Sequence, residues 1–137
     1  MSLGAVGAWL SGRQGIYGEA LLRRRGESGG RKFGRGLLYN VAFAHRLLPA
    51  VYRTYPARQV NAYLELNGSW TARDDVAGDE VASSGGHVLF IAPGLQYIPW
   101  SRLLVETSLQ LPLVRVGNGS QPKPDWTMSF GTRVLLF

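Results

Sequence analysis

Polar and charged side chains recur at every second position in several segments of this sequence. Carboxylate, amide, hydroxyl and guanidinium groups in such rows are typical of a water-filled path whose fixed charges filter what passes. We predict a lining made of Asn61, Tyr63, Glu65, Asn67, Gln96, Arg102, Glu106, Ser108, Gln110, Ser129 and Arg133. The alternative is a filled lumen in which the same side chains satisfy one another.

The sequence offers no catalytic or metal-binding constellation. Cysteine is absent, and the two histidines, His45 and His87, stand apart without a nearby carboxylate at ligand spacing. Residues 83–86 form a Ser-Ser-Gly-Gly loop that lacks the pattern of a nucleophile elbow or a phosphate-binding loop. We therefore expect no catalytic residue, no metal ligand, no cofactor and no enzymatic activity.

The polar rows belong to segments that alternate between apolar and polar residues. In residues 102–113, for example, Leu103, Val105 and Leu109 alternate with Glu106 and Ser108. Alternation over roughly ten residues is the signal of a transmembrane β-strand. We predict seven such strands, at residues 3–11, 15–25, 36–48, 60–71, 88–98, 102–113 and 126–137.

The connections between these strands alternate in length, as outer-membrane barrels require. With a periplasmic C-terminus, the outer connections are residues 26–34, 71–86 and 116–124, and the inner ones are 12–14, 49–58 and 99–101. The inner connection at 49–58 is an exception, because inner connections are expected to be short. Because a complete bacterial barrel has an even number of strands, seven strands indicate the C-terminal portion of a larger barrel.

Composition supports an all-β fold. The 137 residues fit one domain, residues 1–137, and include 18 Gly, 4 Trp, 6 Tyr and 5 Phe. No run of 18 apolar residues suggests a transmembrane helix, and no signal peptide is visible, so we expect an N-terminally truncated chain. The predicted fold is the C-terminal portion, about seven strands, of an antiparallel up-and-down transmembrane β-barrel in the bacterial outer membrane.

Aromatic residues near the predicted strand ends are typical of the girdles at the two membrane interfaces. We place Trp70 and Trp126 at the outer interface, and Tyr97 and Trp100 at the inner one. The final strand closes on Phe137, an ending through which we expect the barrel-assembly machinery to engage the chain. Phe137 is out of phase with Phe130, which requires a bulge or an inward side chain.

The predicted loops also suggest a strand register. Centring each connection places Glu106 opposite Arg133, Gly94 beside Glu106, and Glu65 beside Gly94. We therefore predict an ion pair between Glu106 and Arg133, and a cation preference set partly by Glu65. Gly94 would leave space between the two carboxylates.

Cationic residues gather around the first outer loop, and the chain carries a formal net charge of +6. These residues are Arg23, Arg24, Arg25, Arg31, Lys32 and Arg35. They could pair with lipopolysaccharide phosphates, or they could simply form a solvated rim. Nucleic acid is not an expected partner, because no aromatic platform is interleaved with the charges.

Four segments, residues 61–68, 84–97, 103–114 and 126–137, resemble the outer-membrane family named for the MetA pathway of phenol degradation. The resemblance covers about two thirds of the chain. It implies a β-barrel channel or transporter for small, apolar or aromatic solutes, embedded in membrane lipid. Two alternatives stay open: a non-transporting envelope barrel, and a soluble ligand-binding barrel, in which apolar residues would face inward.

Overall fold

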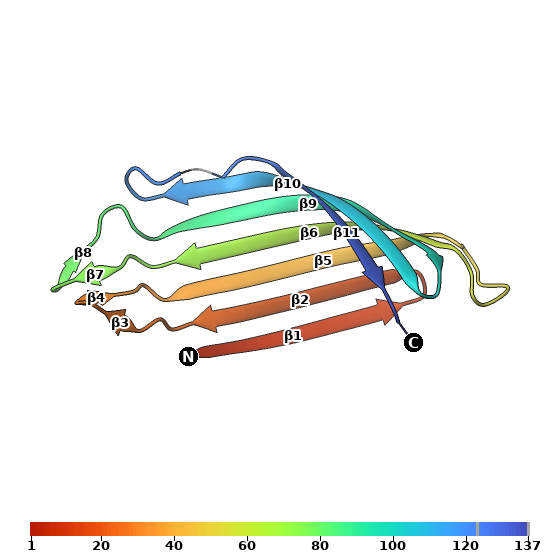
Figure 1. Cartoon of the computed structure of the whole chain (residues 1–137), viewed down its shortest axis with the longest axis horizontal. Helices are drawn as coiled ribbons and strands as arrows, with labels where there is room; N and C mark the ends of the chain where they lie inside the picture. The colour runs from red at the N-terminus through yellow and green to blue at the C-terminus, as the bar shows by residue number, and fades with distance from the viewer. Residues whose placement is uncertain (123, 137) are drawn as a thin grey trace.

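The computed structural model describes residues 1–122 and 124–136. Seven long strands form one antiparallel sheet in which each strand pairs with the next long strand of the chain (Figure 1). These strands are β1 (Ser2–Ser11), β2 (Gln14–Arg23), β5 (Gly36–Leu48), β6 (Gln59–Thr71), β9 (Gly86–Trp100), β10 (Leu103–Gly117) and β11 (Thr127–Val134). The prediction of an all-β, antiparallel fold is therefore confirmed. In the part of the chain described, no helix is long and apolar enough to cross a membrane.

The sheet is curled but open. Within the described residues β1 pairs with β2 alone and β11 pairs with β10 alone, so each outer strand keeps one free edge. β10 and β11 cross in front of the middle strands in Figure 1, which shows how strongly the sheet bends. The sequence predicts the C-terminal portion of a larger barrel, and the structure shows an open, curled sheet that does not close within the described residues.

The connections lie at two ends of the sheet. Short turns at residues 12–13 and 101–102, with the longer connection at 49–58, form what we call the turn end. Residues 24–35, 72–85, 118–122 and 124–126 lie at the loop end, where the connections are longer. The predicted alternation of long and short connections is present, with the same exception at 49–58.

A second, small sheet at the loop end was not predicted. Two of the long connections form two-residue strands, paired in the order β3 (Glu27–Ser28), β4 (Arg31–Lys32), β7 (Asp75–Val76) and β8 (Asp79–Glu80). The turn residues Gly29, Gly30, Ala77 and Gly78 have φ of 58°, 74°, 55° and 96°. Two successive positive φ values define the hairpin turn that suits the strand twist. The Gly29-Gly30 pair predicts such a turn from the sequence. The turn at Ala77 could not be predicted in this way, because alanine rarely adopts a positive φ.

The described structure has almost no hydrophobic core of the kind found between the packed layers of a globular protein. Ala92 is the only buried apolar residue among the described ones, and no second layer covers either side of the large sheet. Large apolar side chains stay uncovered instead, for example Phe130 with an exposed fraction of 75%. The function of the molecule therefore depends on what each side of the sheet faces.

Candidate functional site

The strand register divides the residues of the large sheet between a polar side and an apolar side. Tyr17, Ala42 and Glu65 are cross-strand neighbours on the polar side, whereas the adjacent row on the apolar side contains Ile16, Phe43 and Leu64. The charged residues of the long strands all lie on the polar side: Glu19, Arg23, Arg46, Glu65, Glu106, Arg115 and Arg133. In the described strands, the apolar side carries no Asp, Glu, Lys or Arg.

The predicted lining residues lie together on the polar side, with one exception. The predicted lining residues found on this side are Asn61, Tyr63, Glu65, Asn67, Gln96, Glu106, Ser108, Gln110, Ser129 and Arg133. Arg102 instead lies in the turn that precedes β10, where its backbone oxygen accepts a hydrogen bond from Leu135 at 3.0 Å. Alternation identifies the side of a strand residue, but it says nothing useful for a residue in a turn.

The middle of the polar side forms a hollow of about 470 Å³. Five neighbouring strands, β5, β6, β9, β10 and β11, contribute to its lining. Such a shared hollow places the polar side on the inside of the curl. The lining includes eight of the predicted residues, namely Asn61, Tyr63, Glu65, Gln96, Glu106, Ser108, Gln110 and Ser129.

Hydrogen bonds connect the lining across strands. Asn61 donates from Nδ2 to Gln96 Oε1 at 2.8 Å, and Gln96 donates from Nε2 to Glu106 Oε2 at 3.3 Å. The hydroxyls of Ser108 and Ser129 lie 2.7 Å apart on β10 and β11. The carboxylate of Glu106 is thus held by an amide chain rather than by a cation.

The predicted cross-strand partners are wrong by two residues in each case. Glu106 lies opposite Gly131 and Gln96, whereas Arg133 lies opposite Leu104. Glu65 lies opposite Ala92 rather than Gly94. The described ion pairs do not include the expected pair between Glu106 and Arg133. The predicted connections misplaced the turns: β9 runs on to Trp100, and β10 has register shifts near both of its ends.

Gly94 does not leave the open space that we predicted between two carboxylates. The ring of Tyr63 crosses over it, and the Tyr63 hydroxyl donates to the backbone oxygen of Thr107 on β10 at 3.2 Å. A Cβ atom at Gly94 would lie 2.2 Å from Cζ of Tyr63. The glycine is needed here because a cross-strand tyrosine occupies the space above its Cα.

A further carboxylate on the polar side escaped the sequence analysis. Glu19 of β2 accepts a hydrogen bond from the Tyr17 hydroxyl at 2.6 Å and another from the side-chain amide of Asn40. Tyr17 and Glu19 alternate with Ile16 and Ala20, a pattern that could have revealed them. Glu19, Glu65 and Glu106 therefore place three carboxylates on the inside of the curl.

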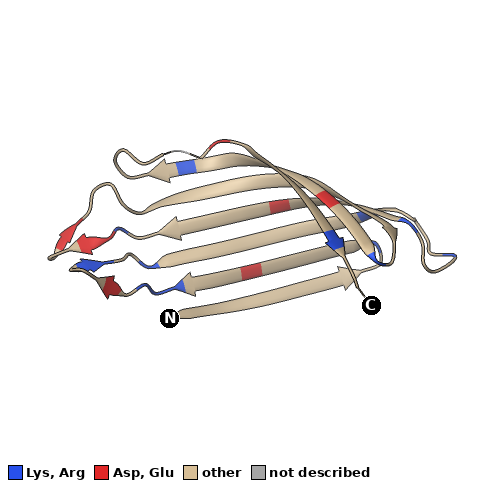
Figure 2. Ribbon diagram, viewed as in Figure 1, with Lys and Arg blue, Asp and Glu red and all other residues tan. Residues whose placement is uncertain are grey.

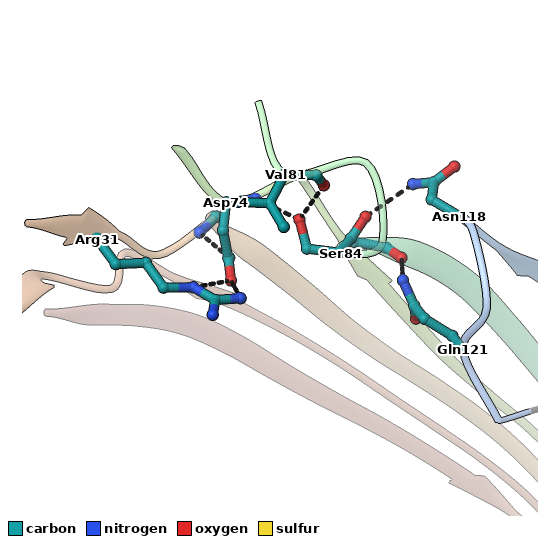
Figure 3. A network of polar contacts seen from close by, with 8 residues as sticks. Arg31, Asp74, Val81, Ser84, Asn118 and Gln121 are labelled. Atoms are coloured by element: carbon teal, nitrogen blue, oxygen red, sulfur yellow. Dashed lines mark hydrogen bonds and ion pairs between the residues drawn. The ribbon is translucent and has the colours of Figure 1, made fainter. Parts of the chain in front are cut away.

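At the loop end, a buried carboxylate joins the small sheet to the neighbouring loop (Figure 3). Asp74 accepts from Arg31 Nη2 at 2.6 Å and Nε at 3.0 Å, and from the backbone N–H of Gly34 at 2.8 Å. The Gly34 N–H and the Arg31 guanidinium lower the pKa of Asp74 below its ordinary value. Arg31 is therefore a structural residue, unlike the other cations of the predicted cluster.

The same network reaches the third loop. The Asp74 N–H donates to Ser84 Oγ at 2.8 Å, and Ser84 Oγ donates to the oxygen of Val81 at 2.7 Å. From the loop after β10, Asn118 donates to the backbone oxygen of Ser84 at 3.0 Å and Gln121 to that of Gly85 at 2.8 Å (Figure 3). Three loops distant in the sequence are thus held together at one end of the sheet.

The predicted girdle residues lie near the ends of the strands. Trp70 is opposite His87 near the loop end, and Trp126 directly precedes β11 at the same end. Tyr97 and Trp100 lie near the turn end of β9. The sequence analysis missed Trp9, which shares the apolar side near the turn end and is 55% exposed.

His87 makes a specific contact on the apolar side. Its Nε2 lies 2.6 Å from the hydroxyl of Tyr39, whose ring crosses over Gly68 of the intervening strand. The described residues contain no group of three or more His, Cys, Asp or Glu side chains arranged to hold a metal ion. Phe137, on which the predicted ending depends, lies outside the described residues.

No protein-family model, curated protein or solved structure matches this chain. The resemblance to the family of the phenol-degradation pathway therefore stays a prediction. The geometry of the two sides of the sheet is the basis on which a function can be proposed.

Proposed function

We propose that this chain forms part of the wall of a bacterial outer-membrane β-barrel that gives small solutes a water-filled path across the bilayer. The observation that carries the proposal is the distribution of charge between the two sides of the sheet. The charged side chains of the long strands face the inside of the curl, and those strands present only uncharged side chains, apart from histidine, on the outside.

The outside of the curl suits lipid better than water. A water-soluble barrel has apolar residues inside and polar residues outside, which is the reverse of the arrangement here. Uncovered apolar surface of this extent marks a membrane or protein interface. The long strands contain 8 to 15 residues, and a tilted strand needs about 9–11 to cross a bilayer.

The directions of the outer strands bear on how the barrel closes. β1 and β11 both run from the loop end to the turn end (Figure 1). If they paired with each other, the joint would be parallel within an otherwise antiparallel sheet. An odd number of further strands would join the two edges in the antiparallel manner, in keeping with the even strand number of bacterial barrels.

The polar side supports a preference among solutes. Glu19, Glu65 and Glu106 place negative charge between the two ends of the sheet (Figure 2). Carboxylates lining a pore favour cations over anions. The family resemblance extends the proposal to small apolar or aromatic solutes, which would pass Tyr17 and Tyr63 on the same side.

Conductance across a planar bilayer containing the purified, assembled barrel to which this chain contributes tests this proposal. We expect cation-selective channels, whose reversal potential in a salt gradient moves toward zero in the triple variant Glu19→Gln/Glu65→Gln/Glu106→Gln. Glu27→Gln, which removes an exposed loop carboxylate, serves as the control and should leave selectivity unchanged. Absence of conductance from correctly inserted protein would show that the proposed channel function is wrong.

The second candidate function is a barrel that spans the membrane but transports nothing. Tyr63 reaching across Gly94, together with the amide chain from Asn61 to Glu106, favours this alternative because small barrels fill their interiors with such contacts. Insertion without conductance is the result that this alternative predicts.

A further inference from the structure

A basic hollow of about 640 Å³ lies at the loop end of β2, beside the Asp74 network. Leu22, Phe33 and Gly34 form part of its wall. Its charged lining residues are Arg23, Arg24, Arg25, Lys32, Arg35, Arg73, Asp75 and Glu80. A volume of this size is in the range of small-ligand sites, about 300–1,000 Å³.

The hollow adjoins residues of the apolar side of the sheet, among them Leu22 in its own lining. A neighbouring hollow shares Ala72, Arg73 and Glu80 with it and is lined in addition by Trp70 and His87, which belong to the apolar side. The row of apolar-side residues nearest the basic hollow starts at Leu3 and continues across the strands through Leu22, Leu37 and Trp70. Through Leu22, the cations of the hollow are neighbours of a row of apolar side chains that the proposed function places against lipid.

Most of the positive charge in this hollow is uncompensated. Arg73 is paired with Glu80 at 3.1 Å, and Lys32 lies between Glu27 and Asp75 in the register of the small sheet. Arg24, Arg25 and Arg35 are exposed, and none of them forms an ion pair with a described residue. Figure 2 shows these basic segments at the loop end, beside the acidic residues of the small sheet.

We propose that this hollow binds the phosphate groups of a lipid whose headgroup carries two phosphates. The forked guanidinium groups of Arg24, Arg25 and Arg35 can each donate two hydrogen bonds to a phosphate. The acyl chains would lie along Leu3, Leu22 and Leu37. The exposed fraction is 71% for Leu3 and 48% for Leu22, and Leu37 is partly exposed. The inference rests on the proposed membrane function, because it requires the apolar side to face lipid.

Native mass spectrometry of the full chain tests the site. The chain is folded into phosphatidylcholine vesicles that contain a minor fraction of a lipid with two headgroup phosphates, and is then extracted in mild detergent. We expect this lipid to be retained, and its apparent affinity to fall by about tenfold or more in Arg25→Gln/Arg35→Gln, since each cation at an anionic surface contributes about fivefold. Arg53→Gln/Arg58→Gln, which removes two exposed arginines at the turn end, should retain the lipid like the unchanged protein.

Two further probes identify the source of the phosphate. The same lipid without its phosphates should be lost on extraction, and inorganic pyrophosphate should bind more weakly than the lipid in calorimetry. Leu22→Ala/Leu37→Ala should weaken the lipid and leave pyrophosphate binding unchanged. Equal binding of pyrophosphate and lipid would overturn the lipid assignment in favour of a free-anion site.

Failure of this site and failure of the membrane function give different results. If the chain inserts into phosphatidylcholine vesicles but Arg25→Gln/Arg35→Gln retains the lipid as well as the unchanged protein does, the phosphate site is wrong and the membrane function stands. If the assembled barrel that contains this chain does not insert into vesicles at all, both proposals are wrong.

Discussion

Glu106 illustrates how the contacts of a single residue depend on strand register. Its position in the alternating sequence correctly predicts the polar side, but its partners are Gln96 and Gly131 instead of Gly94 and Arg133. Because side chains alternate with a period of two, a register error of two residues changes the neighbours and keeps the side. The predicted side can therefore be correct while the predicted ion pair is wrong.

The two sides of β10 should respond differently to one substitution. Leu109 lies on the apolar side opposite Met128, and its neighbour Ser108 lies on the polar side opposite Ser129. We expect Leu109→Arg to lower the free energy of unfolding from vesicles by about 2–4 kcal/mol, because a charge would then enter lipid. Ser108→Arg is the matched change and should cost much less. Equal costs in urea titrations would contradict the membrane assignment.

Asp74 should make the loop end sensitive to acid. The N–H of Gly34 and the guanidinium of Arg31 hold the pKa of Asp74 below its ordinary value of 3.8. The folded state therefore binds this proton less readily than the unfolded state, and the resulting stability is present above pH 3.8 and is lost as the pH falls through the lower, folded-state pKa. We expect the protection of amide hydrogens against exchange in residues 26–34 and 74–86, relative to an unfolded chain at the same pH, to fall in that acidic range.

Asp74→Asn removes the charge and keeps the shape of the side chain. The loop end of this variant should open more easily at neutral pH, by about 1–3 kcal/mol, because a charged hydrogen-bond partner of Arg31 is lost. The remaining protection of its loop-end amide hydrogens against exchange should no longer change in the acidic range. A variant with the same acid transition as the unchanged protein would show that another group is responsible.

At the scale of elements, cross-strand tyrosines explain two glycines of the large sheet. Tyr63 covers Gly94 on the polar side, and Tyr39 covers Gly68 on the apolar side, each reaching a partner on the second strand away. A Cβ at either glycine would meet a ring atom at 2.2 Å or less. These crossings tie three adjacent strands together by one side chain each.

Gly94→Ala should therefore destabilise the sheet. The added methyl group displaces Tyr63 from its hydrogen bond with Thr107, and we expect a loss of about 1–3 kcal/mol in the free energy of unfolding. Gly18→Ala is the control, because a Cβ there meets only Asn40 O at 3.9 Å. The double change Tyr63→Leu/Gly94→Ala should cost less than the sum of its single changes, and strict additivity would exclude the proposed clash.

At the scale of the whole molecule, the aromatic residues should mark two membrane boundaries. Trp70 and Trp126 lie at the loop end, whereas Trp9 and Trp100 lie near the turn end. In variants that keep one tryptophan each, we expect quenching by brominated lipids to be strongest for bromines near the headgroups. A water-soluble quencher added to one side of oriented vesicles should distinguish the two pairs. Strongest quenching of Trp100 at the bilayer centre would contradict this arrangement.

Alternation in the sequence was sufficient to predict the seven long strands and the side on which their residues lie, because strand periodicity is a local property of the backbone. It placed Asn61, Glu65 and Ser129 correctly, and the same reasoning would have found Glu19. Arg102 was misplaced because strand boundaries are less reliable than strand interiors.

Only the tertiary structure decided which residues are neighbours across strands. Register depends on where turns begin and where bulges add a residue, as in β9 between Tyr97 and Trp100 and in β10 between Pro112 and Val114. The small sheet at the loop end likewise brings Arg31 to Asp74 across 43 positions of the chain. Local sequence patterns do not encode these pairings, since they form only when distant segments meet in space.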